Sequence, residues 1–381
     1  MTVDGLRKIA RAEARGSVIV RKRAWSFRIA PMASVLEKLT QELAGSADGY
    51  DRSKEWPEDV LRVLGAHGCW RWGIPRAYGG DEHESVRLIE GLEAIARGSL
   101  TAVLIFTQHD AAADLIMRGE NGALRDRLGP KLAAGEMLLT VGISQLTTSR
   151  QQGGPAMKVS LNGRAATFDG IMPWVTSAGR ADLIVTAGVL DDGRQLLAAM
   201  PTTTPGLAVG PPLELAALEA ASTSTVSCEH ATLDAAHVIR GPLEKVLSLR
   251  APVRPLVVSS AGIGLAGALL SELKKLAPRR GAELRATIEP LFVRYQSVRE
   301  RLYAAADMLS DPSAEAPAGE IRVAVNDLVL RLAIAAVTFA KGTGYLTGQP
   351  AQRLAREAFF FLVWSIPENL QAETLRRFCA S

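Results

Sequence analysis

The sequence predicts an α+β protein in which a helical segment, a strand-rich segment and a second helical segment follow one another. Apolar residues recur at helical spacing over residues 32–137 and again from residue 241 to the end. Short Val-, Ile-, Leu- and Thr-rich runs separated by turn residues fill residues 138–240 and indicate a compact barrel or sandwich. Helices and strands do not alternate, which argues against a parallel sheet. We therefore divide the chain of 381 residues into 1–31, 32–137, 138–240 and 241–381.

Residues 1–31 form a basic leader. They hold eight Lys or Arg against two acidic residues, a net charge of +6, whereas the whole chain carries +4. The remainder is therefore −2, so the basic pI does not indicate a nucleic-acid partner for the folded part. The leader has three interpretations: a disordered or wrongly assigned extension before Met32, a targeting peptide, or a nucleic-acid-binding arm.

The first helical segment contains several stretches with apolar spacing of three and four, separated by Gly- and Pro-containing links. The link Tyr78-Gly79-Gly80 divides it in the middle. The predicted helices are 35–43, 60–68, 86–97, 102–117 and 124–134.

The strand-rich segment has hairpin-type turns at Asn162-Gly163, Asp169-Gly170 and Asp192-Gly193. The predicted strands between and around these turns are 138–143, 157–161, 166–168, 183–189, 195–200, 207–209 and 223–228.

The second helical segment contains four long apolar-patterned stretches, at 257–275, 291–309, 320–339 and 349–364. No apolar stretch reaches the length expected of a membrane-spanning helix, so no membrane association is predicted. Three distant cysteines without a CxxC fit a reducing, cytoplasmic location.

A literal GxGxxG occurs at 262–267, before a predicted helix. It can be a dinucleotide-binding turn or a run of small residues that lets two helices pack closely. We favour close packing, because no second strand follows to complete a βαβ unit. The five histidines have no metal-ligand spacing, so no metal site is predicted.

The segment Pro173–Asp182 is the most informative. Trp174 with Thr176 two residues later would put a flat ring and a hydroxyl on one side of an extended chain. Such a pair suits a large aromatic cofactor, although a core tryptophan beside a turn has the same pattern.

Several segments together resemble the acyl-CoA dehydrogenase family, in order and spacing over most of the chain. Pro75–Gly80 is similar to its P-x-x-[YF]-G-G turn, Trp174–Ser177 to W-I-T-[NS], and Arg353–Ala358 to R-x-x-R-D-A. Further matches are Glu93–Arg97 to E-x-[LI]-[AG]-[RK], His109 where the family often has His, 128–136 to L-P-x-L-A-x-G-E, and Gly342–Tyr345 to G-G-x-G-[YF].

The resemblance implies a helical N-terminal domain, a middle β-barrel and a C-terminal four-helix bundle, with FAD between barrel and bundle. A neighbouring subunit would complete the site, which implies a homodimer or homotetramer. Arg285 takes the position of the arginine that meets the FAD diphosphate, with Arg280 as the alternative. The expected FAD-binding residues are Ser144, Trp174, Thr176, Ser177, Arg285, Gln296, Gly342 and Gly344.

The chain departs from the family at several of these motifs. The family's T-E-P-x-A-G-S-D is Ser144–Gln151 here, with Arg150 at the phosphate-side serine. Thr338 and Glu289 replace a glutamine and a glycine. Flavin binding is therefore expected to be weakened or reorganised.

The family's catalytic base is also replaced. Its glutamate lies eight residues after the acid of R-x-x-R-D, and that position is Ser365 here, a hydroxyl too weak to take an α-proton unaided. The family's alternative base position lies near Arg254, which is no base either. Glu368, three residues after Ser365, is the candidate displaced base.

Three hypotheses remain at this point. The chain is an FAD-dependent oxidoreductase of an acyl thioester on CoA or a carrier protein, a flavin monooxygenase or oxidase, or a catalytically inactive partner. The electron acceptor is left open between an electron-transfer flavoprotein, a reductase and oxygen.

Overall fold

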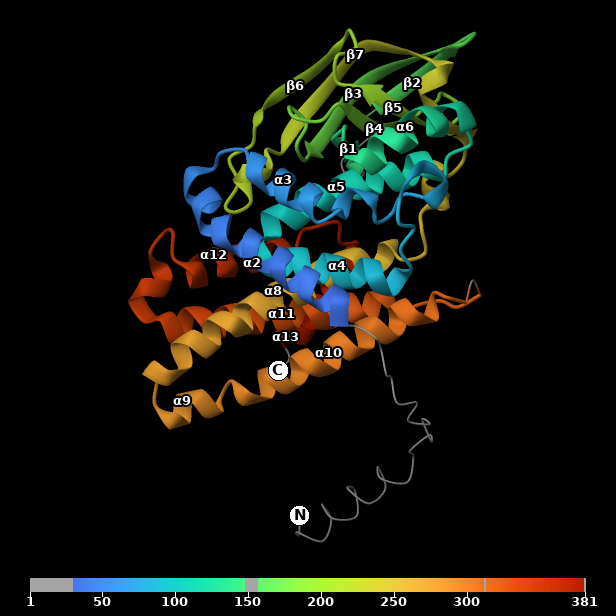
Figure 1. Ribbon diagram of the computed structural model, residues 1–381. Coiled ribbons are helices and arrows are strands. Elements are labelled where there is room, and N and C mark those ends of the chain that lie inside the picture. The colour runs from blue at the N-terminus through green and yellow to red at the C-terminus, as the bar shows by residue number, and fades with distance from the viewer. Residues whose placement is uncertain (1–29, 148–156, 312, 380–381) are drawn as a thin grey trace. The chain divides into compact units, whose positions relative to one another are not determined.

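A computed structural model describes residues 30–147, 157–311 and 313–379. Val35–Ser381 forms one compact unit. Within this unit, Figure 1 shows the strands gathered at the top and the C-terminal helices at the bottom, with α5 beneath the sheet. The basic leader 1–31 lies almost wholly outside the described residues.

The N-terminal helices form as their apolar spacing predicted. Ser99 starts one of them by accepting a hydrogen bond from the Ala102 N–H at 3.2 Å, and Asn121 caps the next by accepting one from Leu124 N–H at 3.0 Å. The helices are α2 (Ala30–Ser53), α3 (Glu58–Ala66), α4 (Ser85–Gly98), α5 (Leu100–Met117) and α6 (Gly122–Ala134).

The middle segment is an open eight-stranded sheet, so the expected barrel is not closed. Its order is β6-β7-β3-β2-β4-β5-β8, and β1 pairs in parallel with β4. Both edge strands contain prolines, Pro211 and Pro212 in β6 and Pro242 in β8, which cannot donate to a further strand. The strands are β1 (Leu139–Gly142), β2 (Met157–Asn162), β3 (Ala165–Val175), β4 (Leu183–Val189), β5 (Gln195–Pro201), β6 (Leu207–Pro212), β7 (Ser224–Asp234) and β8 (Val238–Leu243).

Two of the three predicted hairpin turns are confirmed. Gly163 and Gly193 join β2 to β3 and β4 to β5 with φ of 58° and 84°. The turn predicted at Asp169-Gly170 is wrong, because β3 continues through it. The register against β7 shifts between Phe168 and Gly170, so the glycine marks a bulge rather than a strand end. The strand β8 was not predicted.

The C-terminal segment folds into long helices. The predicted stretch 349–364 ends early, at Phe360, and a turn follows that leads to the left-handed Ser365. A helix follows that the sequence analysis missed. The helices are α8 (Val257–Leu276), α9 (Ala282–Ala286), α10 (Glu289–Met308), α11 (Ala318–Ala340), α12 (Pro350–Phe360) and α13 (Glu368–Cys379).

The GxGxxG run lies inside α8 and packs against neighbouring helices, as the close-packing interpretation predicted. A Cβ at Gly264 would lie 2.5 Å from the Glu93 carbonyl oxygen of α4, and one at Gly262 would lie 2.3 Å from Val325 Cγ1 of α11. Only glycine allows these approaches.

Two helical stretches are long and apolar enough to cross a membrane, contrary to the sequence expectation on length. They are Arg254–Arg279 and Ala318–Tyr345, and 83% and 72% of their most apolar windows are buried inside the protein. Buried core helices of soluble proteins can be equally long and apolar, so the length of these two helices is weak evidence of a membrane span.

Candidate functional site

The segment after Pro173 has a different geometry from the one predicted. Trp174 adopts a left-handed conformation with φ of 60°, so it does not share an extended face with Thr176. Its side chain is 58% exposed, whereas Thr176 and Ser177 are buried. A bulky residue in this region of φ/ψ space is a strained position of the kind found at binding sites.

Hydrogen bonds hold Thr176 and Ser177 in place. The hydroxyls of Thr176 and Thr223 lie 3.2 Å apart, and Thr140 Oγ1 donates to the Thr176 carbonyl at 2.6 Å. The Ser177 N–H donates to the Ala221 carbonyl at 3.0 Å. The segment is therefore held between β1 and the loop formed by residues 213–223.

Ser144 also contacts the segment that contains Trp174, Thr176 and Ser177. It begins the short helix α7 (Ser144–Thr147), and its Oγ donates to the Pro173 carbonyl at 2.8 Å. The next residue, Gln145, is buried; its amide nitrogen donates to the carbonyls of Gly142 and Ala187, while its Oε1 lacks a hydrogen-bond partner among the described residues. Arg150, the predicted departure at the phosphate side, lies outside the described residues.

The two candidate base positions lie in and just after the turn that ends α12. Trp364 is buried, and Ser365 beside it is exposed and left-handed with φ of 46°. Glu368 is the first residue of α13 and is also exposed. The Glu368 carboxylate, three residues after the serine, therefore lies in the first turn of a helix that the sequence analysis missed.

The R-x-x-R-D-A match forms a buried ion network with α2. Arg353 binds Asp48 with Nε at 2.7 Å and Glu357 with Nη1 at 2.9 Å, and Arg356 pairs with Asp51. Burial raises the pKa of Glu357, and Arg353 opposes this shift. The motif thus ties α12 to α2. Its acidic partners lie about 300 residues away in the sequence, so no local pattern could identify them.

The remaining predicted FAD residues lie elsewhere on the C-terminal helices. Arg285 on α9 and Gln296 on α10 are exposed. Arg280, the alternative arginine, donates to the Phe339 carbonyl in the last turn of α11, which favours Arg285 for an external ligand. Gly342 is exposed and Gly344 buried in the short helix η9 (Lys341–Tyr345).

The structure thus brings together Ser144, Trp174, Thr176 and Ser177 but places the other four on α9, α10 and η9. Their roles in binding a cofactor stay predictions. In the described ranges, no group of three or more His, Cys, Asp or Glu could hold a metal ion.

A buried charge cluster stands at the family's alternative base position, which sequence reasoning missed. Arg254 Nη1 lies 2.8 Å from Asp110 Oδ2, and its Nε lies 3.3 Å from Asp114 Oδ2. Burial raises the pKa of Asp110, and the neighbouring guanidinium opposes this shift. Because its guanidinium is bound to both carboxylates, Arg254 is a structural cation.

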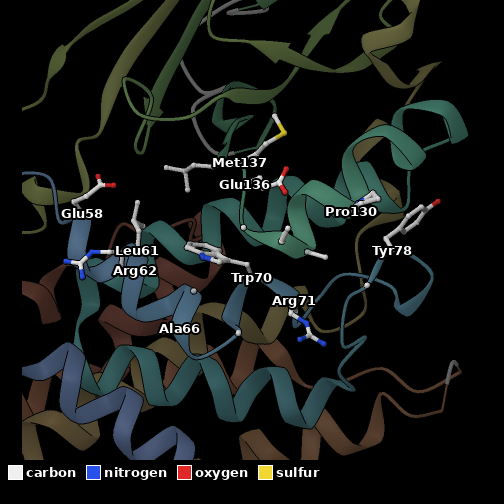
Figure 2. Close-up of a pocket in the computed structure, with 17 residues that line it drawn as sticks. Glu58, Leu61, Arg62, Ala66, Trp70, Arg71, Tyr78, Pro130, Glu136 and Met137 are labelled. Atoms are coloured by element: carbon white, nitrogen blue, oxygen red, sulfur yellow. The ribbon is translucent and has the colours of Figure 1, made fainter.

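A separate cavity has none of these residues in its lining. It has a volume of about 980 Å³ and is lined by α3, the end of α6 and the connection to β1. Figure 2 shows Trp70 at its centre, with Arg62 and Glu58 on one side and Tyr78 on the other. None of the predicted site residues lines it, so this cavity does not mark the predicted site.

Comparisons with known proteins support the predicted family. Residues 31–136 match the sequence model of the acyl-CoA dehydrogenase N-terminal domain. An acyl-CoA dehydrogenase of Bacillus subtilis (strain 168) is 23% identical over 336 residues, which cover 84% of this chain and 88% of that protein. Residues 31–136 thus form an acyl-CoA dehydrogenase N-terminal domain, and most of the chain is similar to acyl-CoA dehydrogenases.

Solved structures of the same fold extend beyond CoA thioester enzymes. A glutaryl-coenzyme A dehydrogenase in complex with glutaryl-CoA has a TM-score of 0.81 at 19% identity, covering 92% of this chain and 95% of that one. The prolyl acyl carrier protein oxidase AnaB has a TM-score of 0.79 at 17% identity, covering 92% and 98%. At these identities the likeness is one of fold alone.

Proposed function

We propose that this chain is an FAD-dependent oxidoreductase that acts on an acyl thioester carried by CoA or by a carrier protein. The observation that carries the proposal is the family match over most of the chain together with a preserved Trp-x-Thr segment at the end of β3. Two proteins of the same fold, a glutaryl-coenzyme A dehydrogenase in complex with glutaryl-CoA and a prolyl acyl carrier protein oxidase, have names that point to this chemical class.

The residues at the end of β3 fit a flavin. Trp174 leaves more than half of its surface uncovered, and a flat ring system would cover it. The hydroxyls of Ser144 and Thr176 lie in the same group and can bond to ring heteroatoms. The exposed guanidinium of Arg285 suits a diphosphate, because its fork of N–H groups matches phosphate oxygens.

Bound FAD would supply the hydride acceptor of an α,β-dehydrogenation. The chain itself must then take the α-proton. Ser365 cannot do this without an activating base, whereas the Glu368 carboxylate can accept a proton directly. We therefore assign the base to Glu368, in the first turn of α13.

Anaerobic flavin reduction tests both the FAD-dependent oxidation of an acyl thioester and the assignment of Glu368 as the base. Purified protein supplied with FAD should be yellow and should bleach when an acyl-CoA or acyl-carrier-protein substrate is added without oxygen. Glu368→Gln should lower the bleaching rate by about 100-fold or more, since general-base catalysis contributes roughly that much. Glu373→Gln, on the same helix and paired with Arg376, should leave it unchanged.

The outcomes separate the alternatives. Protein that binds no FAD would contradict both enzymatic functions and favour an inactive binding partner. Flavin reduced only by a separate reductase, followed by product formation with oxygen, would indicate a monooxygenase. Unchanged bleaching in Glu368→Gln would eliminate this residue as the base.

A further inference from the structure

Arg322 on α11 is a buried cation without an anion. It is 6% exposed, and in the part of the chain that the structure describes no carboxylate lies within ion-pair distance of it. Burial alone lowers its pKa to about 10. Burying a charge is costly unless hydrogen bonds satisfy it, so its partners indicate what this arginine is for.

Those partners are carbonyl oxygens of the turn that follows α12. Nη2 donates to the Phe361 carbonyl at 3.1 Å and to the Trp364 carbonyl at 2.8 Å, and the guanidinium lies 5.9 Å from the centre of the Phe361 ring. Buried backbone carbonyls outside regular secondary structure need hydrogen-bond donors, and a guanidinium supplies several. The Trp364 carbonyl belongs to the peptide that leads directly into Ser365.

The same guanidinium also reaches the following helix. Arg322 Nε donates to Asn326 Oδ1 at 3.0 Å, and Asn326 Nδ2 donates to Thr374 Oγ1 at 3.4 Å. Thr374 in turn donates to the Leu370 carbonyl of α13 at 2.8 Å. Asn326 and Thr374 are almost completely buried, so this connection lies in the core.

We propose that Arg322 is the positioning residue of the turn that carries Ser365 and leads to Glu368. Its two bonds fix the peptide before Ser365, and the link through Asn326 fixes α13, which begins at Glu368. One side chain therefore holds both ends of the segment that presents the base. This role in catalysis rests on the function proposed above.

The test compares three variants of the full-length protein. Arg322→Gln removes the charge and one arm of the fork, and Arg322→Lys keeps the charge with donors that can still reach carbonyl oxygens. Arg299→Gln is the control, because Arg299 is a partly buried arginine on α10 that binds Glu93 and makes no bond to the turn.

We expect Arg322→Gln to raise amide hydrogen exchange over residues 361–370 at least about tenfold and to lower kcat roughly 10- to 100-fold, because small displacements of a catalytic group have effects of this size. KM should change less than about threefold, since a misplaced base affects the chemical step rather than uniform binding. Arg322→Lys should recover most of kcat. Arg299→Gln should lower the melting temperature without changing exchange in this segment or kcat.

The exchange measurement keeps this inference separable from the proposed function. Without turnover in the unaltered protein the proposed function fails, and exchange over 361–370 still decides whether Arg322 orders the turn. Equal exchange in Arg322→Gln and the unaltered protein would overturn the inference. So would a loss of kcat in Arg299→Gln that matches the loss in Arg322→Gln. If Arg322→Gln does not fold, the Lys variant is judged by the same two measurements.

Discussion

Three candidate residues have left-handed backbone although none is glycine: Trp174, Ser177 and Ser365, with φ of 60°, 61° and 46°. Each such residue costs roughly 1–2 kcal/mol, and the surrounding structure must enforce it. Ser177 is held by the loop of residues 213–223, and the peptide before Ser365 is held by Arg322. Their strain is thus concentrated at the segments expected to meet the cofactor and the substrate.

The left-handed conformation of Ser365 predicts which substitution can restore a base there. Asp tolerates this region better than most residues and carries a carboxylate. In a Glu368→Gln background, Ser365→Asp should recover the rate of anaerobic flavin reduction by about tenfold or more. A double variant with normal flavin content and no recovery would show that position 365 does not face the reacting carbon.

His109 makes stability depend on pH. Its Nδ1 accepts the Leu139 N–H at 3.1 Å, so the proton of the neutral ring is on Nε2, and burial lowers its pKa to about 4. The unfolded chain binds a proton below about pH 6.5 and the folded chain does not, so the free energy of unfolding falls as pH drops from about 6.5 to 4.

Relative to His109→Gln, the unaltered protein should lose about 3 kcal/mol over that interval, measured by urea unfolding at fixed pH values. His230→Gln is the matched control, because it removes an exposed imidazole and leaves His109 in place. Identical pH profiles for the unaltered protein and His109→Gln would contradict the assignment.

At the scale of elements, the glycines of α8 set how closely it approaches α4. Gly264→Ala should lower the free energy of unfolding by about 1–3 kcal/mol, because the new methyl group meets backbone atoms that cannot move aside. Gly49→Ala in α2 meets no atom within 4 Å and should raise it by about 0.5–1 kcal/mol. Equal effects in urea unfolding would show that close packing does not require glycine.

Local patterns predicted most elements but not how they meet. Apolar spacing located the helices, and Asn-Gly and Asp-Gly turns located two hairpins, because these signals act over a few residues. Asp169-Gly170 has the same signal, yet pairing with β7 carries the strand through it. The partners of Arg353 and Arg322 are brought together only by the tertiary fold, so sequence gave no sign of either network.

At the scale of the molecule, several large apolar side chains remain exposed on the C-terminal helices. Val293 on α10 is 72% exposed and Tyr345 on η9 is 86% exposed, and Arg285 and Gln296 are exposed too. Light scattering should give a dimer or tetramer, as predicted from the resemblance. Val293→Glu should weaken the assembly if α10 lies in the interface. A monomer with full FAD occupancy would contradict a site shared between subunits.

The loop of residues 213–223 has a consequence for how the protein unfolds. Glu219 pairs with Lys54 of the α2–α3 connection at 2.8 Å, Arg356 of α12 donates to the Ala216 carbonyl at 2.6 Å, and Ser177 donates to Ala221. The sheet is therefore fastened to helices from both ends of the chain. Calorimetric and van't Hoff enthalpies should then agree, because sheet and helices melt in a single cooperative transition.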